Sequence, residues 1–136
     1  MRCLSAIILC LVSAVGAVAE EEGFVSLFDG ESLEGWEIHG GQATYDVEEG
    51  TIVGRVKPNT PGNTFLCTKK PYGNFIFKVG LKLDSPMNSG IQIRSHVREE
   101  GDRVFGYQCE VDPSARAWSG GIYDEARRGW LYPLSG

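Results

Sequence analysis

Residues 89–130 hold most of the side chains in this chain that could do chemistry. Two segments there alternate apolar and polar residues with the period of two that is typical of strands. Their polar positions are Gln92, Arg94 and His96 in the first segment, and Gln108, Glu110 and Asp112 in the second. If the two strands are neighbours and these faces coincide, six hydrogen-bonding or ionisable side chains share one surface. A purely structural sheet rarely needs so many.

Glu110 and Asp112 are two residues apart, so a strand would place both carboxylates on one face. Neighbouring carboxylates split their pKa values, which lets one act as an acid and the other as a base. The alternative is a solvated pair on an edge strand, and Pro113 indicates a turn that would rotate Asp112 away. Glu110 and Asp112 also begin the Glu-x-Asp-x-x-Glu pattern of laminarinase-like retaining glycosidases. Ala115 stands at its third position, so the two-carboxylate mechanism of those enzymes loses support.

Arg94 and His96 are further candidates for a catalytic role. A guanidinium at position 94 could hold a carboxylate, polarise a carbonyl or stabilise an enolate; the alternative is an ion pair with Glu110 or Asp112. His96 could be a general base or a metal ligand. The chain has two histidines, so a carboxylate-rich divalent cation site is the favoured metal hypothesis. His39 is predicted to be an ordinary surface histidine.

Residues 119–130 are predicted to form a loop dense in chemistry. Gly120 and Gly121 permit close approach of the backbone. Sugar sites combine aromatic platforms with planar polar groups. The aromatic candidates are Trp118, Tyr123 and Trp130, and the polar candidates are Asp124, Arg127 and Arg128. The alternative is a core tryptophan beside a solvated charged loop.

Short strands joined by tight turns must position these residues. Eighteen glycines and runs rich in Val, Ile, Thr, Phe and Tyr predict few helices. Strands are expected at 44–47, 51–56, 64–68 and 74–83, then in the two segments described above, with a charged hairpin tip at 99–102. Trp36 is the expected anchor of the core. Repeated strands at this spacing indicate an all-β sandwich or barrel.

The first 19 residues have the features of a secretory signal peptide. Arg2 precedes a short apolar run, and Ala17-Val18-Ala19 forms a small-residue cleavage site. The run is shorter than the roughly 20 residues of a membrane span. We therefore predict export to the periplasm or secretion, no membrane span after removal of the signal, and one domain over residues 20–136.

The formal net charge of −5 argues against a nucleic-acid partner, which would require a basic surface. Two cysteines, Cys67 and Cys109, lie in the predicted mature chain. Export would permit a disulfide between them. Both alternate with apolar neighbours, so two buried free thiols are equally compatible with the sequence.

Five segments, in order, resemble the 3-keto-disaccharide hydrolase family. They are FVSLFDGESLEGWEIHG, CTKKPYGNFIFKVGLKL, NSGIQIRS, GYQCEVDPS and SGGIYDEARRGWL. The resemblance covers essentially all of the predicted mature chain. It implies a concanavalin-like jelly-roll β-sandwich. Because the family domain is longer, we expect the chain to represent the N-terminal part of that domain, truncated at its C-terminus.

The resemblance also implies cleavage of 3-keto-glycosides by elimination and hydration. A ketone at sugar C3 acidifies the proton at C2; a base removes it, an electrophile stabilises the enolate, and an acid assists the leaving group at C1 before water adds. This chemistry needs no nucleophilic carboxylate, which agrees with Ala115. The substrate would be a carbohydrate supplied by a partner oxidoreductase that oxidises sugars at C3.

Roles within that reaction follow from side-chain chemistry and strand faces. We predict Glu110 or His96 as the base or acid, and Arg94 as the stabiliser of the enolate or carbonyl. The predicted substrate contacts are Gln92, Gln108, Asp112, Tyr123, Asp124, Arg127 and Trp130. No cofactor is certain; a divalent metal is a hypothesis, with Glu110 and Asp112 as its ligands. The alternative functions are a non-catalytic, lectin-like carbohydrate-binding module and an adhesion or scaffold domain.

Overall fold

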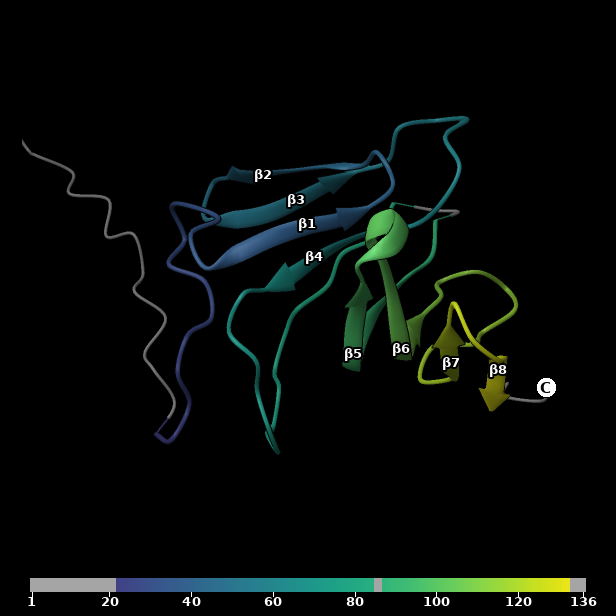
Figure 1. The fold of residues 1–136 in the computed structure, drawn as a ribbon. Helices are drawn as coiled ribbons and strands as arrows, with labels where there is room; N and C mark the ends of the chain where they lie inside the picture. The colour runs from purple at the N-terminus through teal and green to yellow at the C-terminus, as the bar shows by residue number, and fades with distance from the viewer. Residues whose placement is uncertain (1–21, 85–86, 133–136) are drawn as a thin grey trace, which may run out of the picture.

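The computed structural model of the chain describes residues 22–84 and 87–132. This part contains eight β-strands and a single short 3-10 helix, with no α-helix among the described residues (Figure 1). The predicted all-β class is confirmed, and the sheets are consistent with the predicted jelly-roll sandwich. The predicted signal peptide lies outside the described residues.

The first four strands form two antiparallel pairs. β1 (Trp36–Gly40) pairs with β4 (Thr64–Thr68), and β2 (Thr44–Glu48) pairs with β3 (Thr51–Arg55). Glu49 and Gly50, between β2 and β3, have φ values of 48° and 73°, as a tight two-residue hairpin requires. Trp36 is half-buried, and its indole N–H donates to the Leu27 carbonyl at 3.1 Å, which ties the preceding segment to β1. The strands predicted at 44–47, 51–56 and 64–68 are confirmed.

The other four strands form one antiparallel sheet in chain order. They are β5 (Ser89–Arg98), β6 (Arg103–Val111), β7 (Ile122–Glu125) and β8 (Gly129–Tyr132). The predicted hairpin tip between β5 and β6 contains the 3-10 helix η1 (Glu100–Asp102). Figure 1 shows this sheet below β1–β4, with η1 beside the end of β1. The Gly40 N–H donates to the Asp102 carboxylate at 3.0 Å, which joins β1 to η1.

The strand predicted at 74–83 is wrong. Residues 71–84 contain no strand, and most of the large apolar side chains of this segment, including Phe75, Phe77 and Val79, are exposed. Alternation of apolar and polar residues indicates a two-faced segment, but a strand also needs a neighbour for its backbone hydrogen bonds. Among the described residues, no strand pairs with this segment.

The loop predicted at 119–130 is also wrong, because β7 and β8 lie within it. These strands have four residues each, too few for a clear period of two. In β7, Asp124 and Glu125 occupy positions where a sequence pattern favours a loop. In the turn from β7 to β8, Ala126 has a φ of 55°, and Gly129, the first residue of β8, has a φ of 77°. The segment therefore packs on β6 as part of the sheet.

Burial in this fold falls on carboxylates more than on large apolar side chains. Val104 is the single large apolar residue that is fully buried in the described part of the chain. Four carboxylates are buried as well: Glu110, Asp112, Asp124 and Glu125. Burying a charge is costly unless it is paired or hydrogen-bonded, so each must have a built environment. Cys67 in β4 and Cys109 in β6 are free thiols, as in the second alternative, but they are half-buried and not buried.

No helix of the described residues is long and apolar enough to cross a membrane.

Candidate functional site

A row of polar and aromatic side chains crosses all four strands of the β5–β8 sheet. Gln92 of β5 is in register with Gln108 of β6. Gln108 is also in register with Tyr123 of β7, which is in register with Trp130 of β8. Residues directly opposite each other in antiparallel strands project to the same face, and Glu110 shares that face two residues after Gln108. We call the surface formed by Gln92, Gln108, Glu110, Tyr123 and Trp130 the Glu110 face; all five were predicted site residues.

The Glu110 carboxylate is 2% exposed and is held by neutral amides. The Asn88 amide donates to Oε1 at 2.6 Å, and the Gln108 amide donates to Oε2 at 2.8 Å. The Gln92 amide donates in turn to Gln108 Oε1 at 2.9 Å. Such chains of hydrogen bonds polarise one another in a low-dielectric environment. The prediction that the two strands share a polar face is therefore confirmed for these residues.

Gly90 makes room for this arrangement. It lies opposite Glu110 in the β5–β6 register. A Cβ atom at position 90 would lie 2.4 Å from both Cγ and Cδ of Gln108, far inside van der Waals contact. The observed conformation of Gln108, and with it the hydrogen bond to Glu110, thus depends on glycine at this position.

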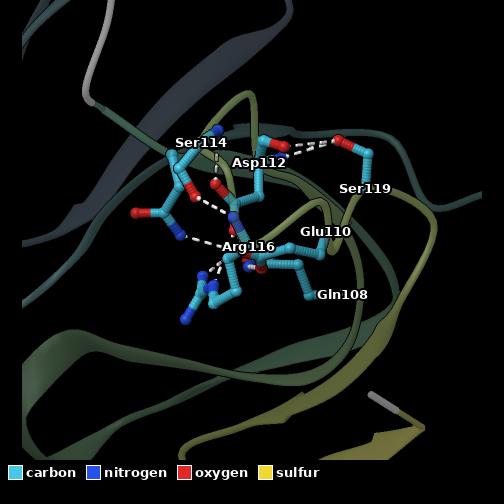
Figure 2. A network of polar contacts seen from close by, with 7 residues as sticks. Gln108, Glu110, Asp112, Ser114, Arg116 and Ser119 are labelled. Carbon is cyan, nitrogen blue, oxygen red and sulfur yellow. Dashed lines mark hydrogen bonds and ion pairs between the residues drawn. The ribbon is translucent and has the colours of Figure 1, made fainter. Parts of the chain in front are cut away.

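The loop that follows β6 returns to Glu110. We call residues 112–121 the Arg116 loop (Figure 2). Its last two residues bind the Glu110 backbone: the Gly120 N–H donates to the Glu110 carbonyl, and the Glu110 N–H donates to the Gly121 carbonyl, both at 2.9 Å. The predicted close approach is confirmed for Gly121, where an added Cβ would lie 3.0 Å from the Trp118 carbonyl oxygen; an added Cβ at Gly120 would meet nothing within 4 Å. The Ser119 hydroxyl closes the loop by accepting from Asp112 N–H at 2.8 Å and donating to the Asp112 carbonyl at 3.0 Å.

Asp112 is the anchor of this loop. β6 ends at Val111, so the predicted turn at Asp112 is confirmed. Its Oδ1 accepts the Ser114 backbone N–H at 3.0 Å, and its Oδ2 accepts Arg116 Nε at 2.7 Å (Figure 2). Hydrogen bonds from Ser114, followed by those from Arg116, lower the pKa of Asp112 to about 2. Asp112 is therefore an ionised carboxylate that fixes Arg116.

Arg116 lies between the two carboxylates and a group of aromatic rings. Its Nη2 is 3.7 Å from Glu110 Oε1, and its side chain is 43% exposed. Its guanidinium carbon is 4.3 Å from the centre of the Trp118 ring and 5.6 Å from that of Trp130, within the range of cation–π contacts. Trp130 makes edge-to-face contacts with Trp118 and with Tyr123, with ring centres 4.6 and 5.1 Å apart. Charge, hydrogen-bond donors and aromatic surface thus meet at the Glu110 face.

Arg94 and His96 make no contact with this group, and the prediction that His96 shares a face with Gln92 is wrong. The β5–β6 register shifts between Ile93 and His96, so β5 carries one extra residue there. Arg94 has a φ of 50° at this bulge, and its guanidinium donates to Asn74 Oδ1 at 2.6 Å. After the bulge, His96 is in register with Phe105, which lies on the other face of β6. One inserted residue reverses the faces of the residues that follow it.

Asp124 and Arg127 also lie away from the Glu110 face. Asp124 is in register with Tyr107, one position from Gln108 and so on the opposite face. It is 0% exposed and accepts from Arg127 and Arg128, each at 2.6 Å. Burial alone would raise the pKa of Asp124, but the hydrogen bonds and charges of Arg128 and Arg127 outweigh burial and lower it. These residues close the β7–β8 turn through the buried Asp124. They therefore also differ from the solvated charged loop, which was the alternative to a sugar-binding loop at residues 119–130.

His39 is not an ordinary surface histidine. Its side chain is 17% exposed, with Nδ1 2.6 Å from Asp102 Oδ1 and Nε2 3.2 Å from Glu37 Oε1. The hydrogen bond with Asp102 raises the pKa of His39, and burial opposes this more weakly. His39 therefore acts in the contact between β1 and η1, away from the Glu110 face.

The donor set does not fit the hypothesis of a divalent cation on Glu110 and Asp112. Divalent cations of this class need several oxygen ligands. Three of the four carboxylate oxygens already accept hydrogen bonds from side chains, and the Arg116 cation occupies the space beside both residues. Within residues 22–84 and 87–132 there is also no group of three or more His, Cys, Asp or Glu that could hold a metal. We derive no step through a metal.

Sequence reasoning missed Asn88 and Arg116. Asn88 lies just before β5, where a period-of-two pattern gives no information about its direction. For Arg116, a weak signal exists: it lies four residues after Asp112, with Ser114 between them, a spacing that suits a turn closed by an aspartate side chain.

Comparison with known proteins agrees with the family resemblance of the five sequence segments described above. A family model described as the 3-keto-alpha-glucoside-1,2-lyase-like domain matches residues 23–134. No curated protein matches the chain.

Proposed function

Because the chain belongs to the 3-keto-alpha-glucoside-1,2-lyase-like family, we propose that it cleaves 3-keto-glycosides at the Glu110 face by elimination followed by hydration. Membership of the family supports a function in carbohydrate chemistry. One observation carries the assignment of the site. Glu110 is a buried carboxylate that accepts hydrogen bonds from neutral amides, which a ligand could replace. It lies beside the half-exposed Arg116 guanidinium and the rings of Trp118 and Trp130. Sugar sites combine these elements.

The proposed reaction begins with transfer of the C2 proton of the substrate to the Glu110 carboxylate. The electron pair of the C–H bond forms a C2–C3 double bond, and the C3 carbonyl oxygen becomes an enolate. The enolate then returns its electrons, a C1–C2 double bond forms, and the C1–O bond breaks. The leaving oxygen takes a proton from solvent, and Glu110 releases its proton to solvent, which restores the carboxylate. Water then adds to the enone, its hydroxyl group to C1 and a proton to C2, which yields the free 3-keto sugar.

Glu110 is the proton acceptor in this proposal, because it is the carboxylate of the Glu110 face that amides rather than cations bind most closely. Asn88, an exposed residue, covers Oε1 with its amide at 2.6 Å. A sugar hydroxyl that replaces this amide brings the neighbouring C2 proton to the same oxygen. General-base catalysis of this kind contributes about 10²–10⁴-fold to a rate.

The aromatic side chains of the site bind the sugar ring. Tyr123, Trp130 and Trp118 are half-buried, so each keeps part of its ring available for stacking. We further propose that the protein is exported, as residues 1–19 indicate, and that an oxidoreductase specific for sugar C3 supplies its substrate. N-terminal sequencing of the mature protein tests export, with Glu20 as the expected first residue.

The test of function uses the full chain with a 3-keto-glucoside carrying a chromogenic leaving group, and the unoxidised glucoside as the control substrate. Release of the leaving group from the 3-keto form alone, with solvent deuterium appearing at C2 of the product, is the expected result. No release from any 3-keto-glycoside offered, whatever its linkage, would refute the proposal.

A second candidate is a carbohydrate-binding module without catalysis. Its support is the near-complete burial of Glu110, which a binding module would use only to orient Gln108 and Arg116. Glu110→Gln separates the two candidates. A catalyst loses turnover and keeps sugar binding, whereas in a binding module the wild-type protein has no turnover to lose.

A further inference from the structure

The Arg116 guanidinium keeps donors free for a ligand. Of its nitrogens, Nε donates to Asp112 at 2.7 Å, and Nη2 lies 3.7 Å from Glu110, too far for a hydrogen bond. Nη1 makes no hydrogen bond to any of the described residues. The side chain is nevertheless 43% exposed, so these N–H groups can meet an incoming molecule.

Arg116 is also held in place before any ligand binds. The Asp112 carboxylate fixes one edge of the guanidinium, and the Trp118 ring lies 4.3 Å from its carbon. The next residue, Ala117, has a φ of 56°, a left-handed conformation that is strained for an alanine. Its backbone N–H donates to the Ser114 carbonyl at 3.0 Å, which closes this turn. Donors fixed in advance are the most effective at stabilising a charge that develops during a reaction.

From this geometry we infer that Arg116, and not Arg94, binds the C3 ketone oxygen of the substrate and stabilises the enolate formed from it. This inference rests on the proposed function. A guanidinium has five N–H donors and no acceptor. A ketone oxygen only accepts hydrogen bonds, so it is fully matched by these donors. A sugar hydroxyl also has an O–H donor, for which the guanidinium offers no acceptor. Arg116 therefore selects the oxidised sugar as well as assisting the reaction.

The charges of the site are balanced throughout the step. Before it, the guanidinium faces the side chains of Asp112 and Glu110. When the C2 proton moves to Glu110, that carboxyl becomes neutral and the negative charge moves to the C3 oxygen. The guanidinium then exchanges a loose 3.7 Å contact with Glu110 for direct hydrogen bonds to the enolate, while its bond to Asp112 is unchanged. The net charge of the site is the same before and after.

The test measures preference for the ketone by calorimetry, with methyl 3-keto-α-glucoside and methyl α-glucoside as the ligands. The Glu110→Gln protein serves as the background, so that the ketone is not consumed. It should bind the 3-keto form about tenfold more tightly or better, as expected for hydrogen bonds to a charged group. In this background, the additional substitution Arg116→Ala should abolish the preference for the 3-keto form. Free guanidinium ion in the buffer should restore part of the preference. Arg55→Ala, which removes a guanidinium paired with Asp46 and Glu48, is the matched control.

Equal binding of the two ligands by the Glu110→Gln protein would overturn the inference. So would a preference that survives Arg116→Ala, or one that Arg94→Ala removes instead. Arg116→Lys keeps the charge and the aliphatic stem, and it provides a second variant if the alanine protein does not fold; its preference should also fall. Because binding is the readout, a protein that prefers the ketone but releases no leaving group refutes the proposed function and the enolate role of Arg116, and it leaves standing only the binding of the ketone oxygen by Arg116.

Discussion

Glu110 and Asp124 are two buried carboxylates on opposite faces of one sheet, and they are held in different ways. Asp124 accepts hydrogen bonds from two guanidinium groups, each at 2.6 Å. Glu110 accepts from two neutral amides at 2.6 and 2.8 Å, and its nearest guanidinium is 3.7 Å away. In both arrangements the buried carboxyl group has hydrogen-bond donors that offset the free-energy cost of its burial. They differ in what remains available to a ligand.

The Asp124 arrangement is closed. Hydrogen bonds to Asp124 and then to Tyr107 raise the pKa of Arg128, so the cation is held by the carboxylate that it neutralises. At Glu110 the donors are neutral, and a sugar hydroxyl can replace an amide at small cost because both are uncharged donors. Two cations thus occupy Asp124, whereas Glu110 keeps the neutral contacts on which the proposed proton transfer depends.

The largest expected effect separates the two carboxylates. Glu110→Gln should lower kcat by about 10²–10⁴-fold, because it removes the proton acceptor, with little change in Tm. Asp124→Asn should do the reverse: Tm falls by several degrees, because two guanidinium groups lose their counter-charge, while kcat of the folded protein stays close to wild type. Turnover of the 3-keto-glucoside and thermal unfolding by circular dichroism measure both. Equal loss of kcat in the two variants, at a temperature where both are folded, would contradict the comparison.

A smaller effect is expected when Arg116 loses its anchor. Asp112→Asn should lower kcat by about tenfold, less than Glu110→Gln, because the guanidinium remains but is no longer fixed. The pKa of Asp112 is lowered from 3.8 to about 2, so its stabilising contribution is present above pH 3.8 and is lost as the pH falls towards 2. The difference in Tm between wild type and Asp112→Asn should therefore be constant near neutral pH and shrink in acid. A difference that grows in acid would show that the protonated form is the one stabilised.

The sequence allowed the Glu110 face to be predicted in part. The period of two in residues 89–93 and 105–111 placed Gln92, Gln108 and Glu110 together, because face alternation holds wherever strands are regular. It failed at His96, which follows the bulge at Arg94, since a bulge changes the number of residues without changing the pattern. Side-chain identity alone gives no sign of where a register shifts.

The rest of the site could not be predicted, because it depends on contacts between segments. Asp112 was expected on a strand face or in a turn, but its partner Arg116 is determined by the path of the loop. β7 was hidden because the burial of Asp124 requires two arginines that come later in the chain. At 74–83 the opposite error occurred: a clear alternating pattern has no partner strand in the described residues.

A modest effect is expected from crowding the amide beside Glu110. Gly90→Ala places a methyl group where Gln108 lies, so Gln108 must move and its bond to Glu110 is lost. Overpacking of this kind costs about 1–3 kcal/mol of stability, and we expect a several-fold loss of kcat. Gly80→Ala is the matched control, because nothing lies within 4 Å of its added Cβ. Unchanged kcat in Gly90→Ala would mean that the amide bond to Glu110 does not contribute to catalysis.

The smallest expected effect lies far from both carboxylates and tests whether pH acts through the fold or through the Glu110 face. The hydrogen bond with Asp102 raises the pKa of His39 above its ordinary value of 6.5, so folding favours the imidazolium form relative to the unfolded chain. This stabilisation is fully present below pH 6.5 and is lost as the pH rises through the folded pKa. The difference in Tm between wild type and His39→Gln should therefore be largest in acid and smallest in base over about pH 5 to 9. Asp102→Asn should reproduce it, because the variant removes the other half of the contact between β1 and η1; a difference that grows with pH would instead show that the neutral imidazole is favoured.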